Sequence, residues 1–255
     1  MKKIFIDAGH NNSGWNTGAL GNGMREQDIT FEVAFLLGEL LKRDFEIRLS
    51  RPTLQTNLGT DNNSAINARW QMSNQWGADY FISIHANAGG GTGAETFFFD
   101  EAARNFATTV QNTYTAEMGL RSRRTELASQ FAVIRETKCP ATLLELAFID
   151  SPLTNPDIEI LRNKRPQMAQ AIANGIYKFF GITPKPPTPP APPPPPTPEP
   201  PPAGKLNIDI RGTVMPIRGH IVDGETWVRL TEFCTALGFN ATWDGERRIP
   251  VVRCC

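Results

Sequence analysis

The chain has 255 residues, enough for one large domain or two smaller ones. Its 26 lysine and arginine residues equal its 26 aspartate and glutamate residues, so no net charge recruits nucleic acid or anionic lipid. No apolar run is long enough to span a bilayer, and the run that follows Met1 ends at Asp7, too early for a signal peptide. We therefore expect no nucleic-acid partner, no membrane span and synthesis in the cytoplasm.

Short apolar runs alternate with helical patterns in the first 181 residues, which indicates an α/β fold with a mostly parallel central sheet flanked by helices. Strands are predicted at Lys3–Asp7, Phe45–Leu49, Tyr80–Ile84, Thr96–Phe99, Phe131–Ile134 and Thr142–Leu146. Apolar stripes predict a helix after an N-cap at Asp28 and further helices over residues 66–76, 106–118 and 168–179, the last ended by Gly181.

A proline-rich segment then interrupts this alternation. Between Pro184 and Pro202 lie 14 of the 21 prolines, which favour polyproline II and a semi-rigid spacer. We predict a large domain at residues 1–181, a linker at 182–203 and a small α+β module at 204–255. The module has short predicted strands at 208–210, 213–216, 220–222, 241–243 and 250–252, and a helix at 231–237. The four cysteines show no CxxC pairing, so a reduced state is expected.

Residues that can bind a metal follow two of the predicted strands. His10 closes the run IFIDAGH and His85 closes YFISIH, and ligands of open α/β sheets gather beyond the carboxyl ends of strands. Two imidazoles and one carboxylate leave a tetrahedral zinc ion with a free position, and a further carboxylate can move protons. Glu145 lies within the apolar run TLLELAF, where an unpaired carboxylate is costly. A structural salt bridge is the alternative explanation for this residue.

The loops after both histidines are rich in small residues. Residues 11–23 are rich in Asn and Gly, and residues 87–93 are nearly all small. Glycines there let the backbone approach an extended polymer, which favours a substrate groove over plain turns.

Four stretches, IDAGH, REQDITFEVA, INARWQMSNQWGADYFISIHANA and LLELAFID, resemble successive blocks of the zinc-dependent N-acetylmuramoyl-L-alanine amidases, the amidase-3 family. The resemblance covers about residues 1–181. It implies that His10, Glu26 and His85 bind Zn²⁺ and that Glu145 is the catalytic acid/base. The implied reaction is hydrolysis of the amide between N-acetylmuramic acid and L-alanine in bacterial peptidoglycan. The chain departs from the family pattern at Ala147 and Asp150, which removes no functional group.

Other functions remain open. A zinc peptidase would need an arginine clamp for a terminal carboxylate, for which Arg51 and Arg69 are candidates. A wall-binding protein without activity belongs to another class, and the presence of all four chemical residues argues against it. A wall hydrolase with a linker, an extra module and no export signal resembles a phage endolysin, held in the cytoplasm until its release to the wall. A host autolysin with the same activity is the alternative.

The pattern VMPIRGHIVDGETWVRLTEFCTALGFNATWDGERRIPVV resembles the small module found at the N-terminus of copper amine oxidases. It implies no copper here, because no ligand cluster surrounds His220. Attachment to the wall or self-association are the roles expected for this module, and an inert appendage is the alternative.

Overall fold

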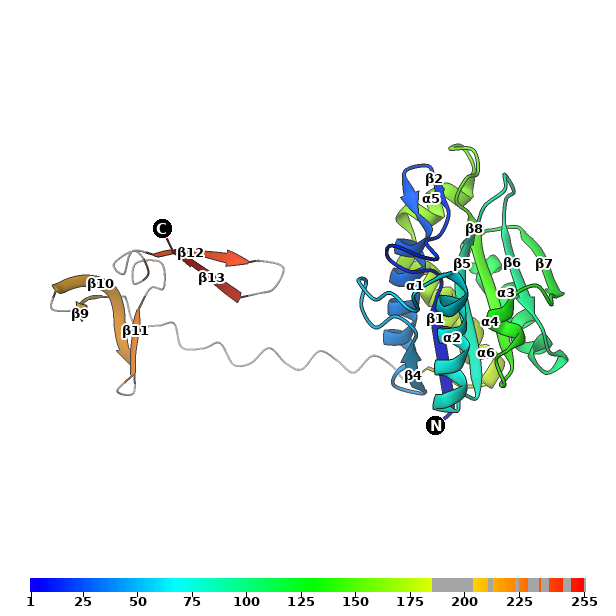
Figure 1. Cartoon of the computed structure of the whole chain (residues 1–255), viewed down its shortest axis with the longest axis horizontal. Helices are drawn as coiled ribbons and strands as arrows, with labels where there is room; N and C mark the ends of the chain where they lie inside the picture. Colours follow the sequence, from blue (N-terminus) through cyan, green and yellow to red (C-terminus); the bar gives the residue numbers. More distant parts are fainter. Residues whose placement is uncertain are drawn as a thin grey trace. The chain divides into compact units, whose positions relative to one another are not determined.

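The computed structural model describes residues 1–184 and, beyond them, residues 204–210, 213–222, 225–228, 234, 239–244 and 249–254. The chain divides into two compact units, Met1–Pro186 and Pro187–Cys255 (Figure 1). The division falls within the predicted linker, of which residues 185–203 lie outside the described part. The predicted domain limits at residues 181 and 203 therefore stay predictions.

The first unit is built on a six-stranded sheet with the order β4-β1-β5-β8-β6-β7 (Figure 1). Strands β4, β1, β5 and β8 run parallel, β6 is antiparallel to β8, and β7 is parallel to β6. This confirms the predicted α/β class with a mostly parallel sheet. In chain order the strands are β1 (Lys3–Ala8), β4 (Glu46–Leu49), β5 (Tyr80–Asn87), β6 (Ala94–Phe98), β7 (Ser122–Leu127) and β8 (Ala141–Phe148).

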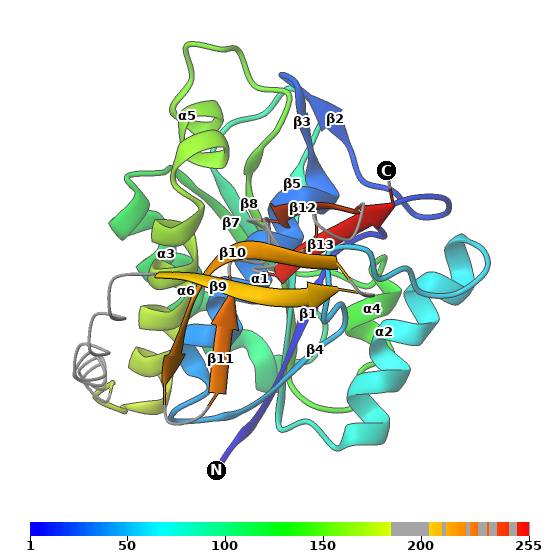
Figure 2. The ribbon, with the colours of Figure 1, turned by 90° about the vertical axis from the view of Figure 1, so that its left-hand side faces the viewer.

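Helices cover both faces of this sheet (Figure 2). The larger core packs α1 (Glu26–Leu41), α3 (Arg104–Met118) and α6 (Arg165–Phe180) against one face. The opposite face carries α2 (Asn62–Trp76) and the four-residue α4 (Ala132–Arg135). The remaining elements are the hairpin of β2 (Leu20–Gly21) and β3 (Met24–Arg25), the 3-10 turn η1 (Glu101–Ala103) and α5 (Pro156–Asn163).

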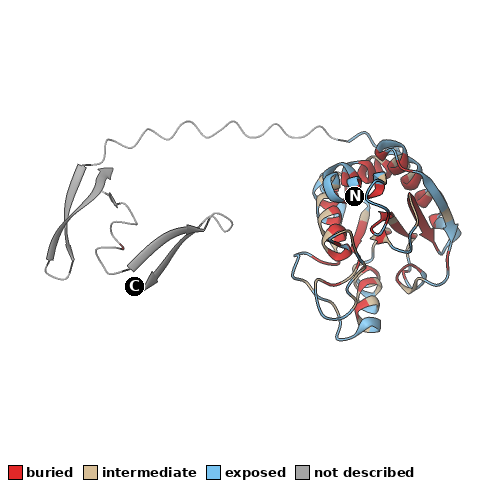
Figure 3. Cartoon of the chain, turned by 90° about the horizontal axis from the view of Figure 1, so that it is seen from above, coloured by how far each residue is buried: buried red, intermediate tan, exposed pale blue. Residues whose placement is uncertain are grey.

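Alternation along the strands decides which face each side chain reaches. In β5, Ile82 and Ile84 belong to the core under α1, α3 and α6, whereas Phe81 belongs to the core under α2 and α4. His85 continues the series of Phe81, so it projects from the face that only α2 and the short α4 cover. Figure 3 shows that buried residues follow the central strands and the helix surfaces turned towards them.

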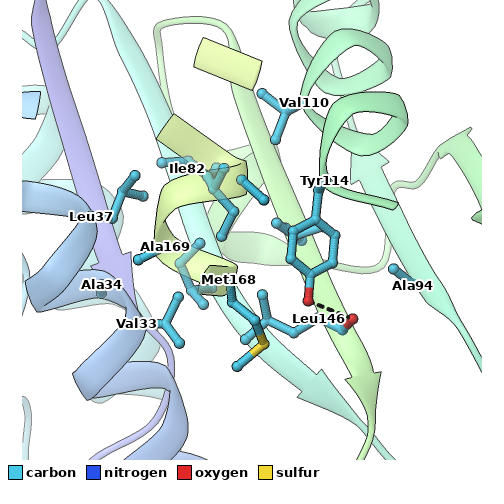
Figure 4. Close-up of a cluster of buried hydrophobic side chains, with 14 of the residues drawn as sticks. Val33, Ala34, Leu37, Ile82, Ala94, Val110, Tyr114, Leu146, Met168 and Ala169 are labelled. Atoms are coloured by element: carbon cyan, nitrogen blue, oxygen red, sulfur yellow. Dashed lines mark hydrogen bonds between the residues drawn. The ribbon is translucent and has the colours of Figure 1, made fainter. Parts of the chain in front are cut away.

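The larger core contains one polar anchor. Tyr114 of α3 is fully buried, and its hydroxyl group donates a 3.1 Å hydrogen bond to the carbonyl oxygen of Leu146 in β8 (Figure 4). Burial raises the pKa of the Tyr114 hydroxyl well above its ordinary value, so the group stays a hydrogen-bond donor. The bond fixes α3 against the strand that carries Glu145.

Two predictions about the elements were wrong, and one strand was missed. Residues 131–134 form no strand: Ala132–Arg135 is the helix α4, because the N–H groups of Arg135 and Glu136 donate to the carbonyl oxygens of Phe131 and Ala132, four residues earlier. The strand β7 was missed because it is an exposed edge strand of polar residues. Asp28 is not the N-cap of α1, since β3 leads directly into the helix at Glu26. Gly181 does end α6, in the left-handed conformation at φ 64°.

The second unit contains a sheet of order β11-β10-β9 and a hairpin of two further strands. Its strands are β9 (Gly204–Ile210), β10 (Thr213–Val222), β11 (Glu225–Val228), β12 (Phe239–Asp244) and β13 (Ile249–Cys254). The strands predicted at 213–216 and 220–222 are one continuous strand, β10. Except for Cys234, the helix predicted at 231–237 lies outside the described residues. In the described part of the chain, no helix is long and apolar enough to cross a membrane.

Candidate metal and catalytic site

Three residues far apart in the sequence converge at the carboxyl ends of β1 and β5. His10 lies two residues beyond β1, Glu26 is the first residue of α1, and His85 lies within β5. His10 Nε2 is 3.0 Å from Glu26 Oε1, His85 Nδ1 is 3.1 Å from the same oxygen, and the two nitrogens are 3.1 Å apart. The structure thus brings together the three residues that the sequence analysis named as metal ligands, and β5 continues to Asn87 instead of ending at His85.

The backbone around His10 is held in an unusual shape by a buried arginine. His10 adopts a φ of 67°, a left-handed conformation that costs free energy for a residue with a side chain. Arg69 of α2 donates 2.6 Å hydrogen bonds to the carbonyl oxygen of His10 and to Asp7 Oδ1. A further hydrogen bond of 2.5 Å reaches the carbonyl oxygen of Ala8. Arg69 therefore fixes the turn that directs His10 towards Glu26.

Two glycines let the backbone pack directly against the converging side chains. A Cβ atom at Gly9 would lie 2.6 Å from His85 Nε2, and one at Gly18 would lie 2.7 Å from Glu26 Oε2. Both distances are shorter than real contacts allow, so any larger residue would displace a side chain of the site. The glycine-rich loop after β1 thus serves the close packing of these groups.

The Glu26 carboxylate is oriented by the backbone. Its Oε2 accepts a 2.8 Å hydrogen bond from the N–H of Ala19, and its Oε1 accepts one of 3.0 Å from the N–H of Ala86. Burial acts to raise the pKa of Glu26, but the hydrogen bonds and charges of His10 and His85 outweigh it, and the pKa lies well below its usual range. Glu26 is therefore ionised at neutral pH and offers a negative ligand oxygen.

A bound cation explains the positions of His10 Nε2, Glu26 Oε1 and His85 Nδ1 better than hydrogen bonds among these atoms do. If both imidazole nitrogens carried a hydrogen and donated it to Glu26, two N–H groups would lie only 3.1 Å apart and neither could accept from the other. A tetrahedral zinc ion separates its ligand atoms by roughly 3.4 Å, slightly more than the observed distances. Within the described residues, His10, Glu26 and His85 are the group of three that could hold a metal ion. A small outward shift of each side chain would complete such a site.

Glu145 lies beside this triad, in the middle of β8. It is directly opposite His85 of β5 in the parallel register and opposite Glu95 of β6 in the antiparallel register. Burial, together with the charges of Glu26 and Glu95, raises the pKa of the Glu145 carboxyl well above its usual range. Its buried Oε2 has no hydrogen-bond partner among the residues that the structure describes. The salt bridge considered from the sequence is therefore not what holds Glu145.

A cavity of about 390 Å³ joins these residues. His10, Glu26, His85 and Glu145 form its polar side. Its apolar lining comes from Ile66 of α2, Phe131 and Val133 at and in α4, and Leu143 of β8. The cavity can thus hold a substrate whose reacting polar group lies at the polar residues and whose apolar part contacts the apolar lining.

Sequence reasoning missed the residues that support the site. Asp7 is fully buried, accepts a 2.6 Å hydrogen bond from the Ser83 hydroxyl group and pairs with Arg69. An acidic residue inside the apolar run of β1 was the signal for this pair. Asp150, noted only as a departure from the family pattern, accepts hydrogen bonds from the N–H groups of Gly89 and Gly90 at 2.7 and 3.0 Å. It fixes the loop that follows His85.

Comparison with known proteins identifies the family of the first unit. A sporulation-specific N-acetylmuramoyl-L-alanine amidase of Bacillus subtilis (strain 168) is 35% identical over 190 residues, which cover 71% of this chain and 69% of that protein. An endolysin of Bacillus phage SPP1 is 28% identical over 72% of this chain and 68% of its own length. The solved catalytic domain of CwlV, an N-acetylmuramoyl-L-alanine amidase from Bacillus (Paenibacillus) polymyxa var. colistinus, superposes with a TM-score of 0.63 at 29% identity, covering 72% of this chain and all of that domain. The Amidase_3 model, described as N-acetylmuramoyl-L-alanine amidase, matches residues 4–178, and the chain belongs to this family.

Proposed function

We propose that the first unit is a zinc-dependent amidase that cleaves the bond between N-acetylmuramic acid and L-alanine in peptidoglycan. His10, Glu26 and His85 would hold the zinc ion, and Glu145 would act as the acid/base. The observation that carries the proposal is the near-equilateral arrangement of His10 Nε2, Glu26 Oε1 and His85 Nδ1, with the unpartnered Glu145 Oε2 in the same cavity.

When bound, a zinc ion lowers the pKa of water and polarises a carbonyl oxygen. Glu145 supplies the proton transfers that amide hydrolysis needs. Its raised pKa makes the carboxylate a stronger base than an exposed glutamate, so it accepts the proton of the attacking water more readily. The same carboxyl group then donates that proton to the departing amine nitrogen of L-alanine.

The contacts of two arginines argue against the zinc-peptidase alternative. Arg51 is fully buried and donates to the carbonyl oxygens of Gln27 and Leu54 at 3.0 and 2.9 Å. Arg69 is equally occupied with backbone carbonyls and with Asp7. Neither guanidinium group is available to clamp the terminal carboxylate of a peptide, which a carboxypeptidase would require.

Mass spectrometry of digested peptidoglycan tests the proposed bond. We expect glycan strands with a free lactyl carboxyl group, together with peptides that begin with a free L-alanine amine. Chelation should abolish the reaction and added zinc should restore it, because the three ligands come from separate elements and no other metal-binding group occurs in the described residues. Cleavage within the stem peptide, or full activity of metal-free protein, would reject the proposal.

We further propose that residues 204–255 bind the wall or self-associate and that the enzyme lyses cells as an endolysin, synthesised in the cytoplasm and acting after release. The similarity to a phage endolysin supports this setting, whereas the similarity to a sporulation amidase favours the host alternative. Expression in a susceptible bacterium separates the two. An endolysin should leave the cells intact until a membrane pore opens, and lysis without a pore would favour an autolysin.

A further inference from the structure

A row of charged side chains crosses the sheet next to the catalytic site. His85 of β5 pairs with Glu145 of β8, Glu145 pairs with Glu95 of β6, and Glu95 pairs with Arg124 of β7. Residues directly opposite each other in neighbouring strands project from the same face of a sheet. The row therefore starts at the proposed metal ligand, passes the proposed acid/base and ends at the exposed edge strand.

A bulge adds a second arginine to the end of this row. The register of β6 and β7 shifts between Ala94 and Glu95, which leaves Arg123 as an extra residue. A bulge of this kind re-aims a side chain, and both arginines reach the same carboxylate oxygen. Arg123 Nε is 2.5 Å and Arg124 Nε is 2.9 Å from Glu95 Oε1.

Glu95 connects the arginines to the cavity. It is 4% exposed, and its Oε2 accepts a 2.8 Å hydrogen bond from the side-chain amide of Asn87, which lines the cavity. A buried carboxylate needs compensation, and a single arginine would provide it. The second guanidinium group is therefore not needed to compensate the buried Glu95 carboxylate.

Of the two arginines, Arg123 is the one with unused hydrogen-bond donors. Arg124 also holds Glu126, with 3.1 Å between Nη1 and Oε1. The terminal nitrogens of Arg123 donate no hydrogen bond to any residue in the described part of the chain. Its guanidinium group lies 5.2 Å from the centre of the Phe148 ring, which restricts its orientation, and its side chain is 32% exposed. Asp150, two residues beyond Phe148, accepts hydrogen bonds from the N–H groups of Gly89 and Gly90.

We propose that Arg123 binds a carboxylate of the departing peptide, on the second stem residue beyond the cleaved amide; this rests on the proposed amidase function. Because Glu145 would donate its proton to the amine nitrogen, that nitrogen must lie next to Glu145. The peptide attached to it would therefore extend past Glu145, towards Glu95 and Arg123. The strands β8, β6 and β7 are neighbours spaced about 4.8 Å apart, so the backbone of Arg124 lies about 10 Å from that of Glu145. An arginine side chain bridges part of this span, and a carboxylate one residue beyond alanine lies roughly 4–8 Å from the amine nitrogen.

Two soluble muropeptides that differ only in the second stem residue test the proposal. One carries D-isoglutamate with a free carboxylate, and the other carries D-isoglutamine, in which that carboxylate is amidated. The wild-type enzyme should show the higher kcat/KM for the free carboxylate, by roughly tenfold, and high salt should reduce this preference. The ratio of the two kcat/KM values is measured on one enzyme sample, so loss of correctly folded protein in a variant cancels.

Variants of the two arginines complete the test. Arg123→Gln should bring the ratio close to one, mainly by raising KM for the acidic muropeptide, and Arg123→Lys should recover part of it. Arg124→Gln is the matched control, because it shares the Glu95 contact, and it should keep the wild-type ratio. No preference in the wild type, or an equal loss of preference in Arg124→Gln, would overturn the assignment. A wild-type enzyme that releases alanine amine from neither muropeptide would reject the amidase function as well.

Discussion

The buried arginine behind the metal site provides a quantitative test of the structure. Arg69→Met keeps the length of the side chain but removes its charge and its hydrogen bonds. The fully buried Asp7 would lose its cation, and the carbonyl oxygens of Ala8 and His10 would lose their donor. Removing one partner of a buried ion pair destabilises a protein by about 3–5 kcal/mol. In a domain of this size we expect Tm to fall by about 6–20 °C.

Thermal unfolding of the metal-free protein, followed by near-UV circular dichroism, measures this loss without the contribution of metal binding. The matched control is Arg104→Met, which breaks the exposed pair of Arg104 Nε and Glu101 Oε2 at 2.6 Å and should barely change Tm. A loss in Arg69→Met no larger than that of Arg104→Met would refute the structural role of Arg69.

The pH dependence of this loss has a definite sign. Burial acts to raise the pKa of Asp7, but Arg69 and the hydroxyl groups of Ser50 and Ser83 outweigh it, so the pKa in the fold is lowered. The pair therefore stabilises the fold above the ordinary aspartate pKa of about 3.9, and this contribution is lost as the pH falls through the lowered pKa. The difference in stability between wild type and Arg69→Met should be largest near neutral pH and should shrink on acidification. A difference that grows on acidification would contradict the argument.

Three further changes test the site and the domain organisation. Glu145→Gln should keep zinc bound while turnover falls by roughly 10²–10⁴, whereas His10→Ala should lose the metal; zinc loss in Glu145→Gln would make that residue a ligand. Gly18→Ala should weaken zinc binding, because the added methyl group would lie 2.7 Å from Glu26 Oε2, and unchanged affinity by zinc titration would exclude this packing role. A protein that ends after Gly181 should cleave soluble muropeptides at nearly the full-length rate but act more slowly on intact walls; equal rates on walls would reject wall binding by residues 204–255.

The sequence by itself determined the fold class and pointed to three of the four residues proposed for the chemistry. Apolar runs of strand length that alternate with helical stripes predicted β1, β5 and β8 and the long helices, because burial depends on local periodicity. Polar residues that interrupt or close those runs, His10, His85 and Glu145, marked the site. Glu26 came only from the resemblance to the amidase-3 family, since an acid at the start of a helix is common without any chemistry.

The tertiary structure decided the partners of these residues. The pairing of Arg69 with Asp7 spans 62 positions in the sequence, and the register that places Glu95 beside Glu145 spans 50. No local pattern encodes such distances, because strand order and register follow from how all the elements pack together. The polar edge strand β7 has no apolar periodicity to detect, and only its pairing with β6 turns Arg123 and Arg124 towards Glu95.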